Sequence, residues 1–101
     1  MSDQQNTVRA ILQKQLAELD AIEKEAVTQS MNTVRGTEEA RKWKARTVAL
    51  IAQQVSPEAA RPLADAKPGP SFTNDLFEEF SDEVELYRER LRAVIKGLPQ
   101  A

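Results

Sequence analysis

The last quarter of the chain carries apolar side chains at a spacing that is typical of a packed helix. They recur at steps of three and four residues without interruption, at Phe77, Phe80, Val84, Tyr87, Leu91, Val94 and Leu98. This alternation places all seven on one helix face, and such a seam must lie against other helices. Gly97 and Pro99 then end the pattern. We therefore predict a final helix whose core anchors are Phe77, Phe80, Tyr87 and Leu91.

A second apolar stripe runs from Val8 to Val27 and includes Leu12 and Leu19. Its period predicts a long first helix over residues 6–28, which frays or bends near residues 28–33. Arg35 followed by Gly36 resembles a helix ending, because a cation suits the last carbonyl groups and glycine accepts a positive φ. Gly36 is therefore the predicted boundary between the first two helices.

The second helix is predicted to start at Thr37, which can cap it, with Glu38 and Glu39 in its first turn. It runs toward Val55. Its inward face is expected to carry Ala40, Trp43, Thr47, Leu50 and Ile51. Among these, Trp43 and Leu50 are the predicted core anchors.

A short third helix and a connector follow. Ser56 supplies a cap and Pro57 a first-turn proline, while Pro62 should break or kink the helix. Two prolines and a glycine within residues 67–71 predict a connector. A chain of 101 residues suits one hydrophobic core. The sequence thus predicts a single all-α domain over residues 1–101, an antiparallel bundle of three main helices and one short helix.

Composition argues against most catalytic chemistry. The chain has neither cysteine nor histidine, which excludes disulfides, thiolate nucleophiles and the usual zinc sites. It also lacks a glycine-rich phosphate loop and a nucleophile with a histidine base. We therefore predict no catalytic residues, no cofactor, no metal and no small-molecule substrate. The polar start and the absence of a run of about 18 apolar residues predict a cytoplasmic protein that does not span a membrane.

Basic residues surround Trp43, and a basic patch with an interleaved aromatic is one footprint of nucleic-acid binding. The cations are Arg41, Lys42, Lys44 and Arg46. At 100° per residue they scatter around the helix, and Glu38 and Glu39 lie three or four residues upstream. Nucleic acid is therefore the least favoured partner.

Residues 75–85 contain six acids and no base. Calcium loops alternate oxygen ligands along an extended turn, whereas these acids lie on a predicted helix. The acidic face is therefore a candidate partner-binding surface, formed by Glu78, Glu79, Asp82 and Glu83.

The first helix offers a second candidate surface. At 1.5 Å per residue it would be about 35 Å long, longer than its neighbours. We expect part of its stripe, with Leu12 and Leu19, or part of the final seam to stay uncovered in a monomer. Such a surface favours self-association or pairing with another helical protein.

Two stretches, EEARKWKARTVALIAQQVSPEAARPL and FEEFSDEVELYRERLRAVIKGL, carry a family resemblance. Together they cover about residues 37–98 and resemble a helical module that precedes Toll/interleukin-receptor-type or other nucleotide-handling effector domains in bacterial defence proteins. The shared features are a tryptophan that opens the second helix, a Ser-Pro pair, a variable loop and a final helix of the form YRERL. Val55 replaces a glycine that the module often has, and the sequence contains no effector domain. The resemblance implies an adaptor or assembly role, with any enzymatic activity in another chain.

These observations predict a non-catalytic protein–protein interaction or assembly module, possessing a site for another protein or for a second copy of itself. An alternative is a small phage- or plasmid-type inhibitor that binds a host enzyme through its acidic helix. A nucleic-acid-binding helical domain is the third hypothesis.

Overall fold

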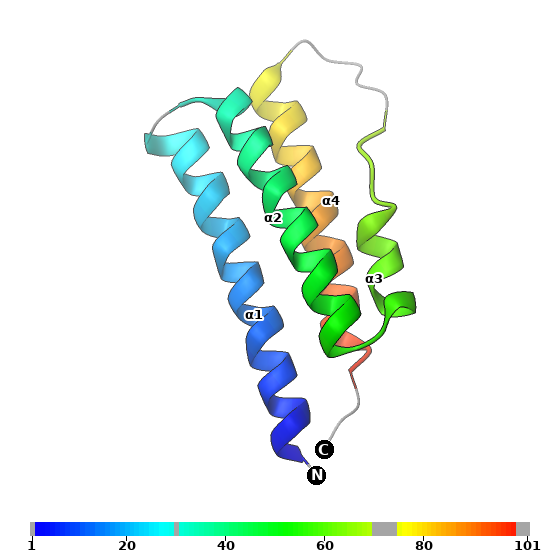
Figure 1. Ribbon diagram of the computed structural model, residues 1–101. Coiled ribbons are helices and arrows are strands. Elements are labelled where there is room, and N and C mark those ends of the chain that lie inside the picture. Colours follow the sequence, from blue (N-terminus) through cyan, green and yellow to red (C-terminus); the bar gives the residue numbers. More distant parts are fainter. Residues whose placement is uncertain (1, 30, 70–74, 99–101) are drawn as a thin grey trace.

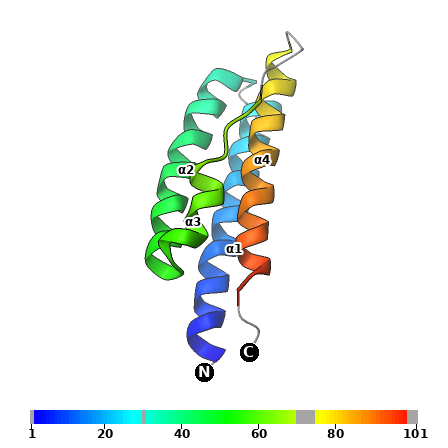
Figure 2. The ribbon, with the colours of Figure 1, turned by 90° about the vertical axis from the view of Figure 1, so that its right-hand side faces the viewer.

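The computed structural model describes residues 2–29, 31–69 and 75–98, and these residues form an elongated all-α bundle (Figures 1 and 2). The predicted fold class is confirmed. Its elements are α1 (Ser2–Lys24), the short π-helical segment η1 (Glu25–Gln29), α2 (Thr33–Gln54), α3 (Pro57–Ala64) and α4 (Leu76–Lys96). None of the helices in the described part of the chain is long and apolar enough to cross a membrane.

The helices α2 and α4 run in the same direction (Figure 1). Arg41 pairs with Glu83, and Trp43 stacks on Tyr87, so the residue numbers of the two helices rise together. The prediction of an antiparallel bundle is wrong for this pair. The reason is topological, because α3 and the connector after it return the chain to the end where α2 begins before α4 starts.

The helix α1 is antiparallel to both of its neighbours. Along α4, Arg88 binds Glu23, whereas Arg9 donates a hydrogen bond to the carbonyl oxygen of Ile95, so the residue numbers run in opposite directions. Two antiparallel neighbours cover the apolar stripe of α1 from both sides.

Gly36 lies inside α2 and does not separate the first two helices as predicted. The boundary falls earlier, where Met31 adopts a φ of 52° and the Asn32 side chain accepts a hydrogen bond from the backbone N–H of Arg35 at 3.0 Å. Asn32 therefore caps α2, and the predicted cap at Thr37 is wrong.

Close packing explains the glycine. A Cβ atom at Gly36 would lie 2.6 Å from the Cβ of Ala26 in η1 and 3.0 Å from the ring of Phe80 in α4. Both separations are shorter than van der Waals contact. Gly36 is thus a point of close approach between three segments, a requirement that no local pattern in the sequence displays.

The short helix α3 starts as predicted. Ser56 caps it by accepting a hydrogen bond from the N–H of Ala59 at 3.0 Å, and Pro57 occupies the first turn. The prediction was a break or a kink at Pro62, and the break does not occur, because the helix continues to Ala64 with Pro62 exposed. Proline removes only one hydrogen bond here, the one that its amide would have given to the preceding turn. Residues 67–69 of the predicted connector are non-helical, and residues 70 and 71 lie outside the described part.

Most of the predicted core anchors are buried. Trp43 and Leu91 are fully buried, and Phe80 and Tyr87 are 2% exposed. Phe77 is 38% exposed, so its prediction as a core anchor is wrong. A straight helix drifts by about 20° per heptad from a seven-residue repeat, so the start of the predicted seam turns outward, whereas Leu98 at its end is buried. Ile95 accordingly lies in the core in place of the half-buried Val94.

Leu50 is also not a core anchor. It is half-buried, whereas its neighbour Ile51 is fully buried. Consecutive helix residues point about 100° apart, so only one of the two can face the centre of the bundle.

Candidate interaction surface

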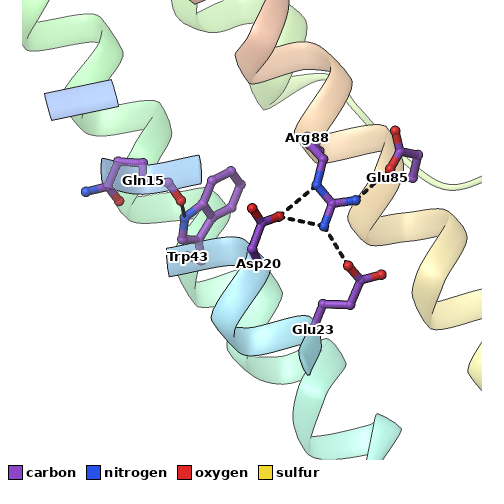
Figure 3. A network of polar contacts seen from close by, with 6 residues as sticks. All are labelled: Gln15, Asp20, Glu23, Trp43, Glu85 and Arg88. Carbon is purple, nitrogen blue, oxygen red and sulfur yellow. Dashed lines mark hydrogen bonds and ion pairs between the residues drawn. The ribbon is translucent and has the colours of Figure 1, made fainter. Parts of the chain in front are cut away.

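Helix α1 packs against α2 along one seam and against α4 along another. Polar contacts as well as apolar packing hold both seams together. In the seam with α2, the indole N–H of Trp43 donates to the carbonyl oxygen of Gln15 at 2.8 Å (Figure 3). The Thr47 hydroxyl donates to the side-chain oxygen of the same glutamine at 3.3 Å. On its other side the indole stacks on Tyr87, with ring centroids 6.4 Å apart. Trp43 is therefore a structural anchor, and its buried ring is not available to stack on a nucleic-acid base.

Arg88 holds the seam between α1 and α4. Its guanidinium binds Glu23 and Glu85 at 2.6 Å each and Asp20 at 2.8 Å (Figure 3). The Arg88 side chain is only 10% exposed. Burial opposes the charge, but the hydrogen bonds to the three carboxylates outweigh that effect and raise the pKa of Arg88. Sequence reasoning missed this cluster, because Asp20 and Glu23 lie 68 and 65 residues from Arg88 in the chain.

Glu83 does not belong to an exposed acidic face. It is 5% exposed and accepts hydrogen bonds from Arg41 at 2.9 and 3.2 Å and from the Tyr87 hydroxyl at 2.7 Å. Burial alone would raise the pKa of Glu83, but these hydrogen bonds lower it below its ordinary value. The prediction that Glu83 binds a partner is therefore wrong, since its carboxylate joins α4 to α2.

The other three acids of the predicted face remain at the surface. Glu78 and Asp82 are exposed, and Glu79 is half-buried. They lie on the first two turns of α4.

The predicted interface on α1 is also wrong. Leu12 and Leu19 are fully buried, because α1 packs against both α2 and α4. The expectation that this stripe stays uncovered in a monomer rested on the lengths of the helices. It did not allow for two long neighbours that flank the same helix.

Large apolar side chains are exposed mainly at one end of the bundle. Five are exposed among the described residues, and four of them belong to the first turns of α2 and α4 or immediately precede α2. We call these four residues the apolar end: Met31, Val34, Leu76 and Phe77. The fifth, Val55, follows the opposite end of α2. The parallel course of α2 and α4 creates this cluster, because it places their first turns side by side (Figure 1).

A small groove runs between the first turns of α2 and α4, and we call it the upper groove. It has a volume of about 150 Å³. Val34 and Leu76 line it together with Phe80, which is buried. Its remaining lining residues are Thr33, Thr37, Arg41, Glu79 and Glu83.

A wider groove of about 480 Å³ follows along the same seam, bounded by α2, α4 and the connector after α3. We call it the lower groove. Its lining residues are Arg41, Lys44, Ala45, Ala66, Lys67, Pro68 and Tyr87. The Lys44 ammonium lies 5.2 Å from the Tyr87 ring centroid and donates to the carbonyl oxygen of Ala66 at 2.7 Å. Burial lowers the pKa of Lys44 below its ordinary value.

Sequence reasoning did not identify the apolar end. The available signal was that Met31, Val34 and Leu76 are large apolar residues outside the helical stripes. Scattered surface hydrophobic residues are common, so such residues indicate a site only when the fold brings them together.

Comparisons of the chain with protein-family models, with curated proteins and with solved structures found no match. The resemblance to a module of bacterial defence proteins therefore stays a prediction.

Proposed function

We propose that this chain is a non-catalytic protein–protein interaction module whose partner docks on the apolar end. The observation that carries the proposal is that four of the five exposed large apolar side chains of the described residues lie at the end where α2 and α4 begin, and that two of them, Val34 and Leu76, line the upper groove. Contiguous apolar patches on soluble proteins mark interaction sites. Covering one such side chain contributes up to about 1.5–3 kcal/mol, so a few of them support specific binding.

An adaptor or assembly role in bacterial defence, the role implied by the sequence resemblance, is compatible with this surface. The inhibitor hypothesis would place a host enzyme against the same end, since Glu78 and Asp82 are exposed on α4 beside Leu76 and Phe77. Self-association through the apolar end is a third form of the same proposal.

The test is the double variant Val34→Asp, Leu76→Asp, compared with Val55→Asp as a matched control away from the apolar end. Tagged chains are expressed in the native host, cross-linked and purified, and the recovered proteins are quantified. We expect specific partners to fall at least about tenfold with the double variant and to be retained with the control. Sedimentation of the purified chain measures self-association in parallel.

Both variants should keep the fold, because aspartate replaces an exposed side chain and such changes usually alter stability by about 0.5 kcal/mol or less each. Circular dichroism and urea unfolding check this. The proposed function would be contradicted if every protein were recovered equally with the wild type, the double variant and the control, and if the purified chain had a monomeric mass at high micromolar concentration.

A further inference from the structure

The upper and lower grooves adjoin at Arg41 on the seam of α2 and α4, and we call the two grooves together the track. Arg41 lines both of them, with its side chain 62% exposed while its guanidinium binds Glu83. From Val34 to Lys44 the track follows ten residues of α2, which corresponds to about 15 Å at 1.5 Å per residue. A segment of roughly ten helical residues would span it.

The two ends of this track differ in chemistry. The upper groove has apolar edges at Val34 and Leu76, and the half-buried Glu79 is the one acid of its lining that has no ion pair with Arg41. Glu78 and Asp82 add negative charge nearby on α4. This end therefore accepts apolar groups and repels anions.

The lower groove carries an excess of positive charge. Arg41, Lys44 and Lys67 line it, and the carboxylates of Glu83 and Asp65 favour the charged form of Lys44. The Glu83 carboxylate already pairs with Arg41 and accepts a hydrogen bond from the Tyr87 hydroxyl. A bound segment that carries carboxylates would neutralise the remaining positive charge of the lower groove, whereas a basic segment would be repelled.

We propose, on the basis of the proposed function, that the docked partner segment is a short amphipathic helix with apolar side chains at one end and carboxylates at the other. The apolar side chains enter the upper groove, and the carboxylates face Lys44 and Lys67. Glu78, Glu79 and Asp82 exclude the acidic end of the segment from the upper groove. Complementary and repulsive charges together fix the direction in which the segment lies, which is the usual role of interface charges.

The experiment selects peptides from a random dodecapeptide library displayed on phage, with the intact chain as bait. Enriched peptides are synthesised with a fluorescent label and titrated by anisotropy against variants. Lys44→Gln with Lys67→Glu tests the lower groove, and Val34→Asp with Leu76→Asp tests the upper groove. Lys42→Gln with Lys96→Glu is the matched control, because it changes the net charge equally at exposed residues outside both grooves.

We expect enriched peptides that combine apolar residues at one end with Asp or Glu at the other. Their affinity should fall about tenfold or more with each groove variant and be retained with the control. A tenfold loss of affinity corresponds to about 1.4 kcal/mol of binding free energy. Unfolding midpoints establish that each variant is folded. A twelve-nucleotide polyuridylate is titrated in the same assay to measure binding of a nucleic acid.

Enrichment of basic peptides, no enrichment, or acidic peptides whose affinity is unchanged by the lower-groove variant would overturn this inference. Tighter binding of polyuridylate than of the peptides, lost with the same variant, would also overturn it. None of these outcomes removes the proposed function, which fails if partner recovery from the host does not depend on the apolar end and the purified chain is monomeric.

Discussion

The two seams of α1 and the seam between α2 and α4 contrast in how they are closed. Trp43 and the Arg88 cluster join α1 to its antiparallel neighbours. The parallel seam between α2 and α4 is covered by α3 only along its lower part and by a connector near Ala66 and Pro68 (Figures 1 and 2). It therefore carries two grooves, although its own bridge between Arg41 and Glu83 is intact.

Two buried charges on α4 illustrate the same contrast. The buried Arg88 pairs with three carboxylates, of which Glu23 is only 28% exposed, whereas the buried Glu83 has one ionic partner, Arg41, that is 62% exposed. Removing Arg88 leaves three neighbouring carboxylates without their cation. Breaking the pair of Glu83 and Arg41 releases an arginine that water already solvates. The closed seams should therefore contribute more to stability, and the open seam should be freer to bind a partner.

The largest effect is expected for Trp43→Ala, which empties the centre of the bundle. Deleting a buried tryptophan usually costs about 3–5 kcal/mol, and here the carbonyl of Gln15 also loses its indole donor. Urea unfolding at pH 7 measures the change. Val55→Ala, at an exposed residue after α2, is the control and should stay within about 0.5 kcal/mol. Equal midpoints for the two variants would contradict the central role of Trp43.

Arg88→Leu should destabilise the protein by about 2–3 kcal/mol. Loss of one partner from a buried pair costs about 3–5 kcal/mol, and the partial exposure of Asp20 and Glu85 reduces that cost. Because the stranded carboxylates repel one another, the deficit should shrink in 1 M salt, where the screening length falls to about 3 Å.

The matched control is Arg92→Leu, an exposed position one turn later on α4. It should change the unfolding free energy by about 0.5 kcal/mol or less at either salt concentration. A deficit for Arg88→Leu that grows with salt would show that repulsion among the carboxylates is not its cause.

Gly36→Ala tests the point where η1, α2 and α4 meet. Alanine favours a helix over glycine by up to about 1 kcal/mol, but the new methyl group would lie 2.6 Å from Ala26. Overpacking of this kind costs about 1–3 kcal/mol, so we expect net destabilisation.

Adding Ala26→Gly should restore part of the loss, because it removes the nearest colliding methyl group. Gly97→Ala is the control, since its Cβ would meet only ordinary contacts of 3.4 Å or more. Thermal unfolding of the wild type, Gly36→Ala, Ala26→Gly, the double variant and Gly97→Ala measures these effects. An additive double variant would refute steric collision between the two positions.

The smallest effect is expected for Glu83→Gln in the open seam, about 1 kcal/mol at pH 7, the typical net value of a hydrogen bond. The pKa of Glu83 is lowered in the folded protein, so its charge stabilises the fold above the ordinary value of 4.5. That contribution is lost as the pH falls through the folded-state pKa. The difference between wild type and variant should therefore shrink below pH 4.5.

Urea unfolding at pH 7, 5 and 3 gives the three differences. Asp82→Asn, one residue away and exposed, serves as the control and should show little change at pH 7. A Glu83→Gln deficit equal to that of Arg88→Leu at pH 7 would remove the distinction between open and closed seams.

Local patterns in the sequence were sufficient to predict most elements of the fold. Helical periodicity predicted the three long helices and the buried positions of Trp43 and Leu91. Ser56 and Pro57 predicted the start of α3, because a cap acts on backbone groups only three residues away. These features depend on neighbours in the chain, and for that reason they can be inferred from spacing alone.

Tertiary structure alone decided the candidate interaction surface. Gly36 resembled a helix terminator until the approach of Ala26 and Phe80 defined its role. Glu83 was indistinguishable from the exposed acid Asp82, because its partner Arg41 lies 42 residues away in the chain. The apolar end likewise exists only because α3 reverses the chain and makes α2 and α4 parallel. A helix pattern shows which face of a helix is apolar, but only packing determines which of these faces remain uncovered.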